Sequence, residues 1–283
     1  MRIDTVGVVG AGQMGAGIAQ VAAQADLAVV LYDVAPGILD RALQSMEKSL
    51  VRLHEKQRLG TRTPADIVGK VRATATFDEL ATADAVIEAV PEDFELKKAV
   101  LQRLDLLCGP DVIFASNTSS ISLTQLGGVT KRPAKVIGMH FMNPPAVLQL
   151  VEIVRSLTTS DETYRAIREL AERMGKTTIL AKDYAGFIVN RILLPMINEA
   201  IYAVYEGVGS VEDIDSGMKL GTAQPMGPLA LADLIGLDTC LAVLERLHTG
   251  LGDDKYRPCP LLRNYVAAGY LGRKVGRGFY TYG

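Results

Sequence analysis

The beginning of the chain constrains its fold more than any other segment, because three glycines stand between a predicted strand and a predicted helix. Residues 6–9 form an apolar run with strand composition. The glycines that follow, in the spacing G-x-G-x-x-G, are Gly10, Gly12 and Gly15. Apolar residues then recur at helical spacing over 14–25, and a second strand is predicted over 28–32. This order is typical of the first half of a parallel, nucleotide-binding α/β sheet.

Each part of this segment has a mechanical role in holding a nucleotide. Gly10 permits the tight turn, Gly12 lets the backbone approach a pyrophosphate, and Gly15 lets helix and strand pack closely. The pyrophosphate would meet the free N–H groups and the positive dipole of the helix start. We therefore take the whole turn, Met14 included, as a candidate cofactor-binding segment. The alternative is a glycine turn that binds no nucleotide.

An acidic residue indicates which dinucleotide would bind. Asp33 ends the second strand, eighteen residues after Gly15, where it would bond the adenosine ribose hydroxyls. A 2′-phosphate beside it would be repelled by roughly 1 to 4 kcal/mol, depending on solvent exposure. No arginine follows immediately, since the next residues are Val34, Ala35 and Pro36. The sequence thus predicts NAD rather than NADP.

Strands alternate with helices up to about residue 184, and the chain then reads as helix only. The further predicted strands are 71–75, 83–90, 111–115, 136–141, 147–154 and 177–180. Helices are expected after Asp33 to about residue 58 and over 93–107, with a polar break at Pro64. This pattern predicts an α/β domain over 1–184 with a doubly wound, mostly parallel sheet of the Rossmann type, and an all-α domain over 185–283.

Composition excludes several classes of protein. The chain of 283 residues is 48% hydrophobic and 22% charged, with a net charge of −2, which gives no reason to expect binding to nucleic acid or to an anionic membrane. Residues 5–25 are uncharged, but five glycines and three glutamines argue against a membrane span or signal. We expect no targeting extension, because the first strand begins near Met1. Three cysteines without C-x-x-C spacing and three scattered histidines predict no metal site and suit a reducing cytoplasm.

The predicted strands 136–141 and 147–154 each carry one ionisable group, and the turn 143–145 joins them. Neighbours of Glu152 are apolar on both faces of its strand, so a bare carboxylate there would cost several kcal/mol. His140 on the preceding strand is the nearest candidate partner. A carboxylate that orients an imidazole makes a general base able to work near neutral pH. The alternative is a buried pair with only a structural role.

Over its full length the sequence resembles the short-chain L-3-hydroxyacyl-CoA dehydrogenases, most closely their bacterial 3-hydroxybutyryl-CoA branch. The motifs that carry the resemblance are GAGQMGAGIAQ, IEAVPEDFELKK, ASNTSSIS, GMHFMNPP, LVEIV, GFIVNRIL, DIDSGMKLG, PMGPLALAD, IGLDTC, KYRPCPLL and GYLGRKVGRGFY. The resemblance implies reversible oxidation of 3-hydroxyacyl-CoA to 3-oxoacyl-CoA with NAD, on a Rossmann domain followed by a helical dimerisation domain.

The resemblance also implies roles for individual residues. His140 matches the catalytic base and Glu152 its partner acid, while Ser119 and Asn190 match residues that bond or hold the reacting oxygen of the substrate. The cofactor contacts that it adds to the glycine turn are Gln13, Asp33, Ala89, Glu92, Lys97, Ser119, Asn143 and Lys274. Without the resemblance, Glu92 and Lys97 read as a solvated helix start, Ser119 as a loop-capping hydroxyl and Asn190 as an ordinary helix residue.

The CoA moiety is expected on the helix after Asp33. Ser49, Arg52 and Lys56 lie on one face of that helix at i, i+3 and i+7, with two cations suited to an anionic nucleotide. The alternative is a solvated basic stripe. Departures from the family pattern at Met142, at 145–146 and at Gln149 line the predicted acyl side, so they bear on the length of the acyl chain.

The helix predicted over 187–205 is apolar nearly all round, and a small helical domain has limited room to cover it. We therefore expect a homodimer, and we expect a charge at Ile197 to disturb it. Two rival functions stay open. One is a related dehydrogenase of a free sugar acid, such as L-gulonate, which would not need the basic stripe. The other is a catalytically silent NAD-binding protein, which would not need the paired His140 and Glu152.

Overall fold

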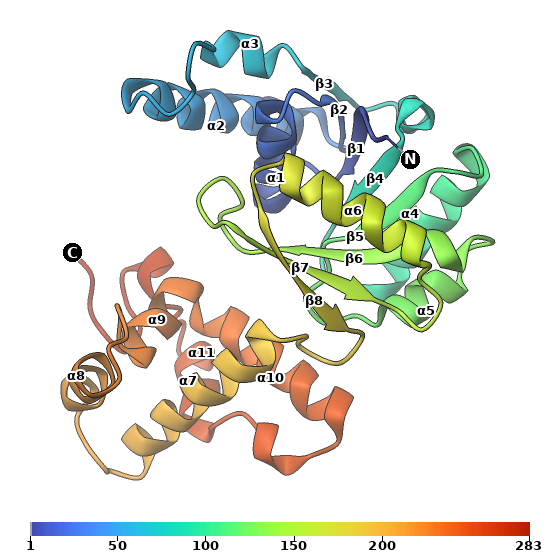
Figure 1. The fold of residues 1–283 in the computed structure, drawn as a ribbon. Helices are drawn as coiled ribbons and strands as arrows, with labels where there is room; N and C mark the ends of the chain where they lie inside the picture. Colours follow the sequence, from blue (N-terminus) through green and yellow to red (C-terminus); the bar gives the residue numbers. More distant parts are fainter. Residues whose placement is uncertain (1) are drawn as a thin grey trace. The chain divides into compact units, whose positions relative to one another are not determined.

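The chain divides into two compact units in the computed structural model, which describes residues 2–283 (Figure 1). The first unit runs to Asp183 and the second begins at Tyr184. The first unit is built on one eight-stranded sheet and the second consists of helices. The two predicted fold types, a sheet with helices and then helices alone, are confirmed.

The sheet of the first unit has the strand order β3-β2-β1-β4-β5-β6-β7-β8. Its strands are β1 (Thr5–Val9), β2 (Ala28–Tyr32), β3 (Val71–Thr74), β4 (Ala85–Glu88), β5 (Ile113–Ser116), β6 (Val136–Phe141), β7 (Leu150–Arg155) and β8 (Thr177–Lys182). Neighbours from β3 to β6 pair in parallel, whereas β6 and β7 are antiparallel and β7 and β8 are again parallel. The mostly parallel sheet is therefore confirmed.

Helices cover the two faces of this sheet. They are α1 (Gln13–Gln24), α2 (Pro36–Glu55), α3 (Pro64–Val68), α4 (Phe94–Leu107), α5 (Leu123–Gly128) and α6 (Asp161–Arg173), with 3-10 turns η1 (Phe77–Thr82) and η2 (Pro133–Lys135). The helix after Asp33 does end before Pro64, but Pro64 begins a further short helix, α3, that the sequence analysis did not predict. Thr63 and Asp66 form a reciprocal capping box, and proline is well suited to the first helical turn.

Side chains alternate between the two faces of the sheet, so an apolar core lies on one face and the predicted His–Glu pair lies on the other. Side chains such as Ile137, Met139 and Ile153 pack with α1, α2 and α6 in one large apolar core. Because successive side chains of a strand point to opposite faces, His140 and Glu152 lie on the other face. Glu88 at the end of β4 and Ser116 at the end of β5 share that face, because their strand neighbours Ile87 and Ala115 belong to the same core.

One strand begins later than the sequence suggests. We predicted a strand from residue 147, but β7 begins at Leu150. The N–H groups of Val147 and Leu148 both bond to the carbonyl of Pro144 at 3.0 Å, so a tight turn takes up these residues. Their apolar side chains are exposed, by 70% for Val147 and 43% for Leu148.

The second unit packs its helices around a core of its own. They are α7 (Val189–Tyr205), α8 (Val211–Gly221), α9 (Pro228–Ile235), α10 (Leu237–Leu251) and α11 (Pro260–Ala267), with the 3-10 turns η3 (Asp254–Tyr256) and η4 (Arg273–Val275). Helix α7 starts two residues later than predicted, because Gly186 and Phe187 both have positive φ and turn the chain. Ile197 is fully buried in this core, so the expectation that it lies on an apolar outer surface is wrong.

Candidate functional site

The glycine turn has the close approaches that its sequence predicts. Gly10 has a φ of +97°, and a Cβ on it would lie 2.9 Å from the carbonyl oxygen of Ala89. A Cβ on Gly15 would lie 1.7 Å from the carbonyl oxygen of Gly10, so only glycine lets α1 start this close to the turn. Around Gly12, by contrast, a Cβ would meet nothing within 4 Å. The turn is therefore tightly packed from behind and open at the position where a pyrophosphate is expected.

Asp33 holds this turn as well as ending β2. Its carboxylate accepts hydrogen bonds from the N–H of Ala11 at 2.8 Å and from the N–H of Ala35 at 3.0 Å. A carboxylate has about four acceptor positions, so these two bonds leave capacity for ribose hydroxyls. The acid thus links the glycine turn to the start of α2.

A cavity of about 510 Å³ opens beside the glycine turn. It is lined by residues of α1, α2 and the segment 144–146, among them Gly12, Gln13 and Ser49. Arg41 and Ser45 also line it, and the sequence analysis missed both. Their spacing of four residues along α2, ending at Ser49, was the signal that could have found them. Arg52, further along α2, and Lys56, just after its end, are exposed and do not line this cavity.

The predicted His–Glu pair is present on adjacent antiparallel strands. His140 and Glu152 are direct register partners, and Nδ1 of the imidazole lies 2.7 Å from Oε2 of the carboxylate. His140 is 7% exposed and Glu152 is fully buried. This contact fixes the ring orientation and assigns Nδ1 to the carboxylate.

Glu92 organises the loop that carries Ser119. One oxygen of this carboxylate, Oε1, accepts hydrogen bonds from the N–H and hydroxyl of Ser119, at 2.8 and 3.1 Å, and from those of Ser120, at 3.0 and 2.9 Å. The hydroxyl of Thr118 donates to the same oxygen at 2.7 Å. Two residues predicted from separate motifs, Glu92 and Ser119, therefore lie in direct contact.

Lys97 lies beneath this loop and is only 1% exposed, so its interpretation as part of a solvated helix start is wrong. Its Nζ lies 2.7 Å from Oε1 of Glu88 and 3.3 Å from Oε2 of Glu92. Burial raises the pKa of Glu88, although Lys97 and Ser116 favour its charged form. Burial acts in the same direction on Glu92, but Lys97 and the donors of the loop outweigh it and hold the pKa of Glu92 below its usual range. Glu88 was not among the predicted residues.

The remaining predicted residues lie in both units. Asn143 is exposed in the turn after β6, and Ala89 packs against Gly10. Asn190 and Lys274 belong to the second unit, where Nζ of Lys274 pairs with the carboxylate of Asp238 at 2.5 Å. Roles for these residues in binding stay predictions.

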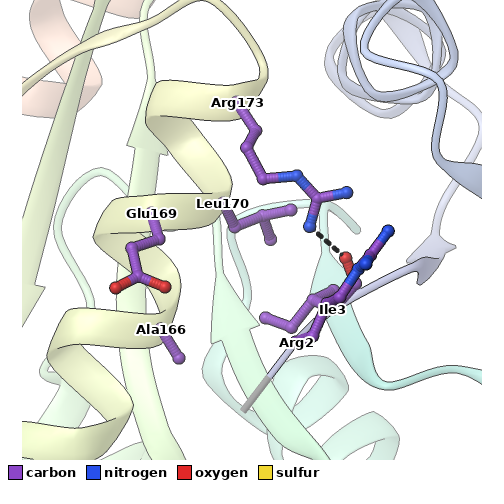
Figure 2. A pocket seen from close by; sticks show the side chains of 6 residues that line it. All are labelled: Arg2, Ile3, Ala166, Glu169, Leu170 and Arg173. Atoms are coloured by element: carbon purple, nitrogen blue, oxygen red, sulfur yellow. Dashed lines mark hydrogen bonds between the residues drawn. The ribbon is translucent and has the colours of Figure 1, made fainter.

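A second cavity of the first unit lies away from these residues (Figure 2). Its volume is about 380 Å³, and it is lined by Arg2, Ile3, Ala166, Glu169, Leu170 and Arg173. Arg173 donates to the carbonyl of Ile3, just before β1 begins. The glycine turn follows the other end of β1, and none of the predicted site residues lines this cavity. Within residues 2–283 no three His, Cys, Asp or Glu side chains gather as a metal site would require.

A sheet with a nucleotide-binding turn on β1 and a carboxylate-paired histidine on a later strand is the arrangement of a dinucleotide-dependent dehydrogenase. Models of the NAD binding domain and of the C-terminal domain of 3-hydroxyacyl-CoA dehydrogenase match residues 5–184 and 186–282. The chain belongs to the 3-hydroxyacyl-CoA dehydrogenase family, and it is an enzyme that uses NAD.

Individual relatives match over nearly their whole length. The chain is 54% identical to a probable 3-hydroxybutyryl-CoA dehydrogenase of Bacillus subtilis, over 100% of this chain and 98% of the relative. It is 50% identical to the 3-hydroxybutyryl-CoA dehydrogenase of Bradyrhizobium diazoefficiens, over 99% and 96%. The crystal structure of (S)-3-hydroxybutyryl-CoA dehydrogenase from Ralstonia eutropha superimposes with a TM-score of 0.96 at 50% identity, covering 99% of each chain. None of the helices within residues 2–283 combines the length and apolarity that a membrane crossing needs.

Proposed function

We propose that this enzyme reversibly oxidises (S)-3-hydroxybutyryl-CoA to acetoacetyl-CoA with NAD. The names of the similar proteins from three bacteria support the substrate. The observation that carries the proposal is the contact of 2.7 Å between His140 and Glu152, because it supplies the acid–base group that such a reaction needs.

In the oxidising direction, His140 takes the proton of the substrate hydroxyl through Nε2. Bound NAD supplies the acceptor for the hydride that leaves C3. Glu152 stabilises the imidazolium formed in this step, because a buried carboxylate 2.7 Å away favours the cation. In the reducing direction the imidazolium returns the proton to the oxygen. Ser119 and Asn190 orient that oxygen and stabilise its changing charge by hydrogen bonds.

Bound NAD is held by the glycine turn and the residues around it. The N–H groups at the start of α1 face the pyrophosphate, since the cap residue Gly12 places no side chain over them. Asp33 takes the adenosine ribose and disfavours a 2′-phosphate. The other contacts assigned to the cofactor are Gln13, Met14, Ala89, Glu92, Ser119, Asn143 and Lys274. Lys97 was also predicted as a contact, but its side chain is only 1% exposed, so it acts from beneath the site. The CoA moiety is assigned to Ser49, Arg52 and Lys56, with Arg41 and Ser45 added by the cavity beside the turn.

The experiment that tests this proposal is NADH oxidation by the purified enzyme with acetoacetyl-CoA and a series of longer 3-oxoacyl-CoA thioesters. We expect the highest kcat/KM with acetoacetyl-CoA. Turnover of L-gulonate with NAD, without turnover of any thioester, would favour the sugar-acid dehydrogenase. NADH binding without turnover of either kind would favour a catalytically silent protein.

We also propose a homodimer built by the helices of the second unit. Ile192 on α7 is 67% exposed and Ile188, just before the helix, is 38% exposed, which leaves apolar surface for a second copy. Because Asn190 stands between them in sequence, association and activity are expected to be coupled. Ile192→Asp should therefore lower both dimer content in light scattering and turnover. The matched control is the exposed Leu106→Asp in the first unit, and a fully active wild-type monomer would contradict the proposal.

A further inference from the structure

Three buried polar side chains form a row beneath the loop that carries Ser119. Glu88 and Ser116 are register partners at the ends of β4 and β5, both are fully buried, and Ser116 Oγ donates to Oε2 of Glu88 at 2.7 Å. The other carboxylate oxygen of Glu88 accepts from Lys97 Nζ and from the N–H of Val90, both at 2.7 Å. A buried carboxylate destabilises the fold unless it is paired and hydrogen-bonded, and Glu88 has three donors.

Lys97 uses its full donor capacity within this row. An ammonium group has three N–H donors, and three oxygens surround Nζ. They belong to Glu88 at 2.7 Å, to the carbonyl of Val90 at 3.1 Å and to Glu92 at 3.3 Å. Glu88 therefore fixes the place of the cation, and the cation in turn holds the second oxygen of Glu92.

From this row, hydrogen bonds lead to the loop that carries Ser119 and to β6, the strand of His140. Ser116 Oγ accepts from the N–H of Thr118 at 3.3 Å, and Thr118 donates to Glu92 at 2.7 Å. The N–H of Asn117 donates to the carbonyl of Glu88 at 2.8 Å. Oδ1 of Asn117 accepts from the N–H of Phe141, next to His140, at 2.9 Å. Displacing Glu88 would thus displace Glu92 and the loop around Ser119 together.

We propose that Glu88 is a positioning residue of the NAD site, and that Lys97 serves this site through Glu92. This inference rests on the proposed roles of Glu92 and Ser119 in binding the cofactor and the substrate oxygen. Glu88 itself touches neither ligand. It presets the geometry of the loop, so that no loop ordering has to accompany binding.

The test is Glu88→Gln, which keeps the shape of the side chain and removes the charge that fixes Lys97. We expect NADH to bind about tenfold more weakly, measured by NADH fluorescence, and turnover of acetoacetyl-CoA to fall by about tenfold or more. The matched control is Asp105→Asn on the same helix, α4. Asp105 forms a partly buried ion pair with Arg132 at 2.7 Å but has no part in the row. Asp105→Asn should lower the melting temperature and leave NADH affinity unchanged.

A double variant separates positioning from stability. Lys97→Met leaves Glu88 buried without its cation and should be strongly destabilised, and adding Glu88→Gln should restore stability by removing that charge. NADH affinity should stay low in the double variant, because Glu92 has still lost Lys97. A purely structural role would restore stability and NADH affinity together, and that result would overturn the inference.

Two further outcomes, a Glu88→Gln variant that does not fold and a wild type without thioester turnover, still leave the inference testable. If Glu88→Gln does not fold, Ser116→Ala removes only the bond to Oε2, and its NADH affinity must still fall by a factor of about two or more. Unchanged affinity in that variant would also overturn the inference. If the wild type turns over no thioester, the proposed function fails, while the NADH titrations of Glu88→Gln and Asp105→Asn still test the positioning role.

Discussion

Buried carboxylates occur in both units of the molecule, but their partners differ. In the first unit, Glu152 pairs with an imidazole and Glu88 with an ammonium group. In the second unit, Asp233 accepts from the N–H groups of Phe279 and Tyr280 and from the hydroxyl of Tyr282, all at 2.9 Å. Asp233 on α9 therefore binds donors of the last residues of the chain and holds that segment against the helix.

Asp215 in the second unit is likewise bound by backbone N–H groups and a tyrosine hydroxyl. It accepts from the N–H groups of Leu229 and Ala230 at the start of α9, at 2.8 and 2.9 Å, and from the hydroxyl of Tyr280 at 3.0 Å. Such contacts satisfy a helix start and join segments, which is a structural use of a buried acid. A buried acid whose partner is an imidazole can instead hold or move a proton near neutral pH, whereas burial raises the pKa of Tyr280 and of Tyr282, the hydroxyl partners of Asp215 and Asp233. This difference favours the first unit as the place of the proposed chemistry.

The contrast between the two units predicts its largest effect on turnover for substitutions of His140. His140→Ala or His140→Gln should cut turnover by about 10²-fold or more, because a general acid–base group contributes roughly that much. NADH affinity should stay near normal. Steady-state kinetics and NADH titration measure the two effects. His248→Gln is the matched control, since His248 also contacts an acid, Asp254 at 3.1 Å, but on the exposed surface of the second unit. If both variants keep most of their turnover, His140 has no part in the chemistry.

Glu152→Gln comes next. The amide keeps the shape of the side chain but cannot stabilise an imidazolium, so turnover should fall by about tenfold or more. The pH–rate profile should change as well, since the charge state of the pair controls the reaction. The measurement is kcat and kcat/KM across a pH series. A profile that overlays the wild type would reduce Glu152 to a structural neighbour and would weaken the contrast with Asp233.

The pair at His140 and Glu152 could be predicted from sequence because its cause is local. The apolar neighbours on both sides of Glu152 indicated a buried carboxylate, which needs a partner. The short turn before its strand indicated that the preceding strand lies beside it. The glycine turn was equally local, since Gly10 and Gly15 are required by atoms within one strand–turn–helix segment. Period, spacing and turn residues carry this kind of information.

Other features depend on contacts that no short segment records. Lys97 follows a run of charged residues, and only the packing of α4 over the ends of β4 and β5 buries it against Glu88. On α7, sequence showed that the helix is apolar but not which side faces its own core, so Ile197 and Ile192 were not told apart. The roles proposed for Asn190 at the substrate and for Lys274 at the cofactor likewise depend on residues far from them in the sequence.

Asp233→Asn should have a structural effect only. The new amide N–H₂ group is itself a donor, and it would face the N–H and O–H donors that now bond the carboxylate. This mismatch should lower the free energy of unfolding by about 1 to 3 kcal/mol. Urea unfolding measures this loss, and kcat of the folded enzyme should stay within about twofold of the wild type. A large fall in kcat without loss of stability would break the distinction drawn between the two units.

The smallest expected effect is a dependence of stability on pH at Glu92. The folded protein holds the pKa of Glu92 below its usual value, with Lys97 and the hydroxyl and N–H donors of the loop outweighing burial. Because the unfolded chain then binds the proton more readily, the ionised carboxylate stabilises the fold at a pH above its ordinary pKa. That contribution is lost as the pH falls through the lowered folded-state pKa. The difference in unfolding free energy between the wild type and Glu92→Gln should therefore shrink from about pH 6 to about pH 4, as urea titrations can measure. A difference that stays constant or grows on acidification would mean that Lys97 and the loop do not favour the charged form of Glu92.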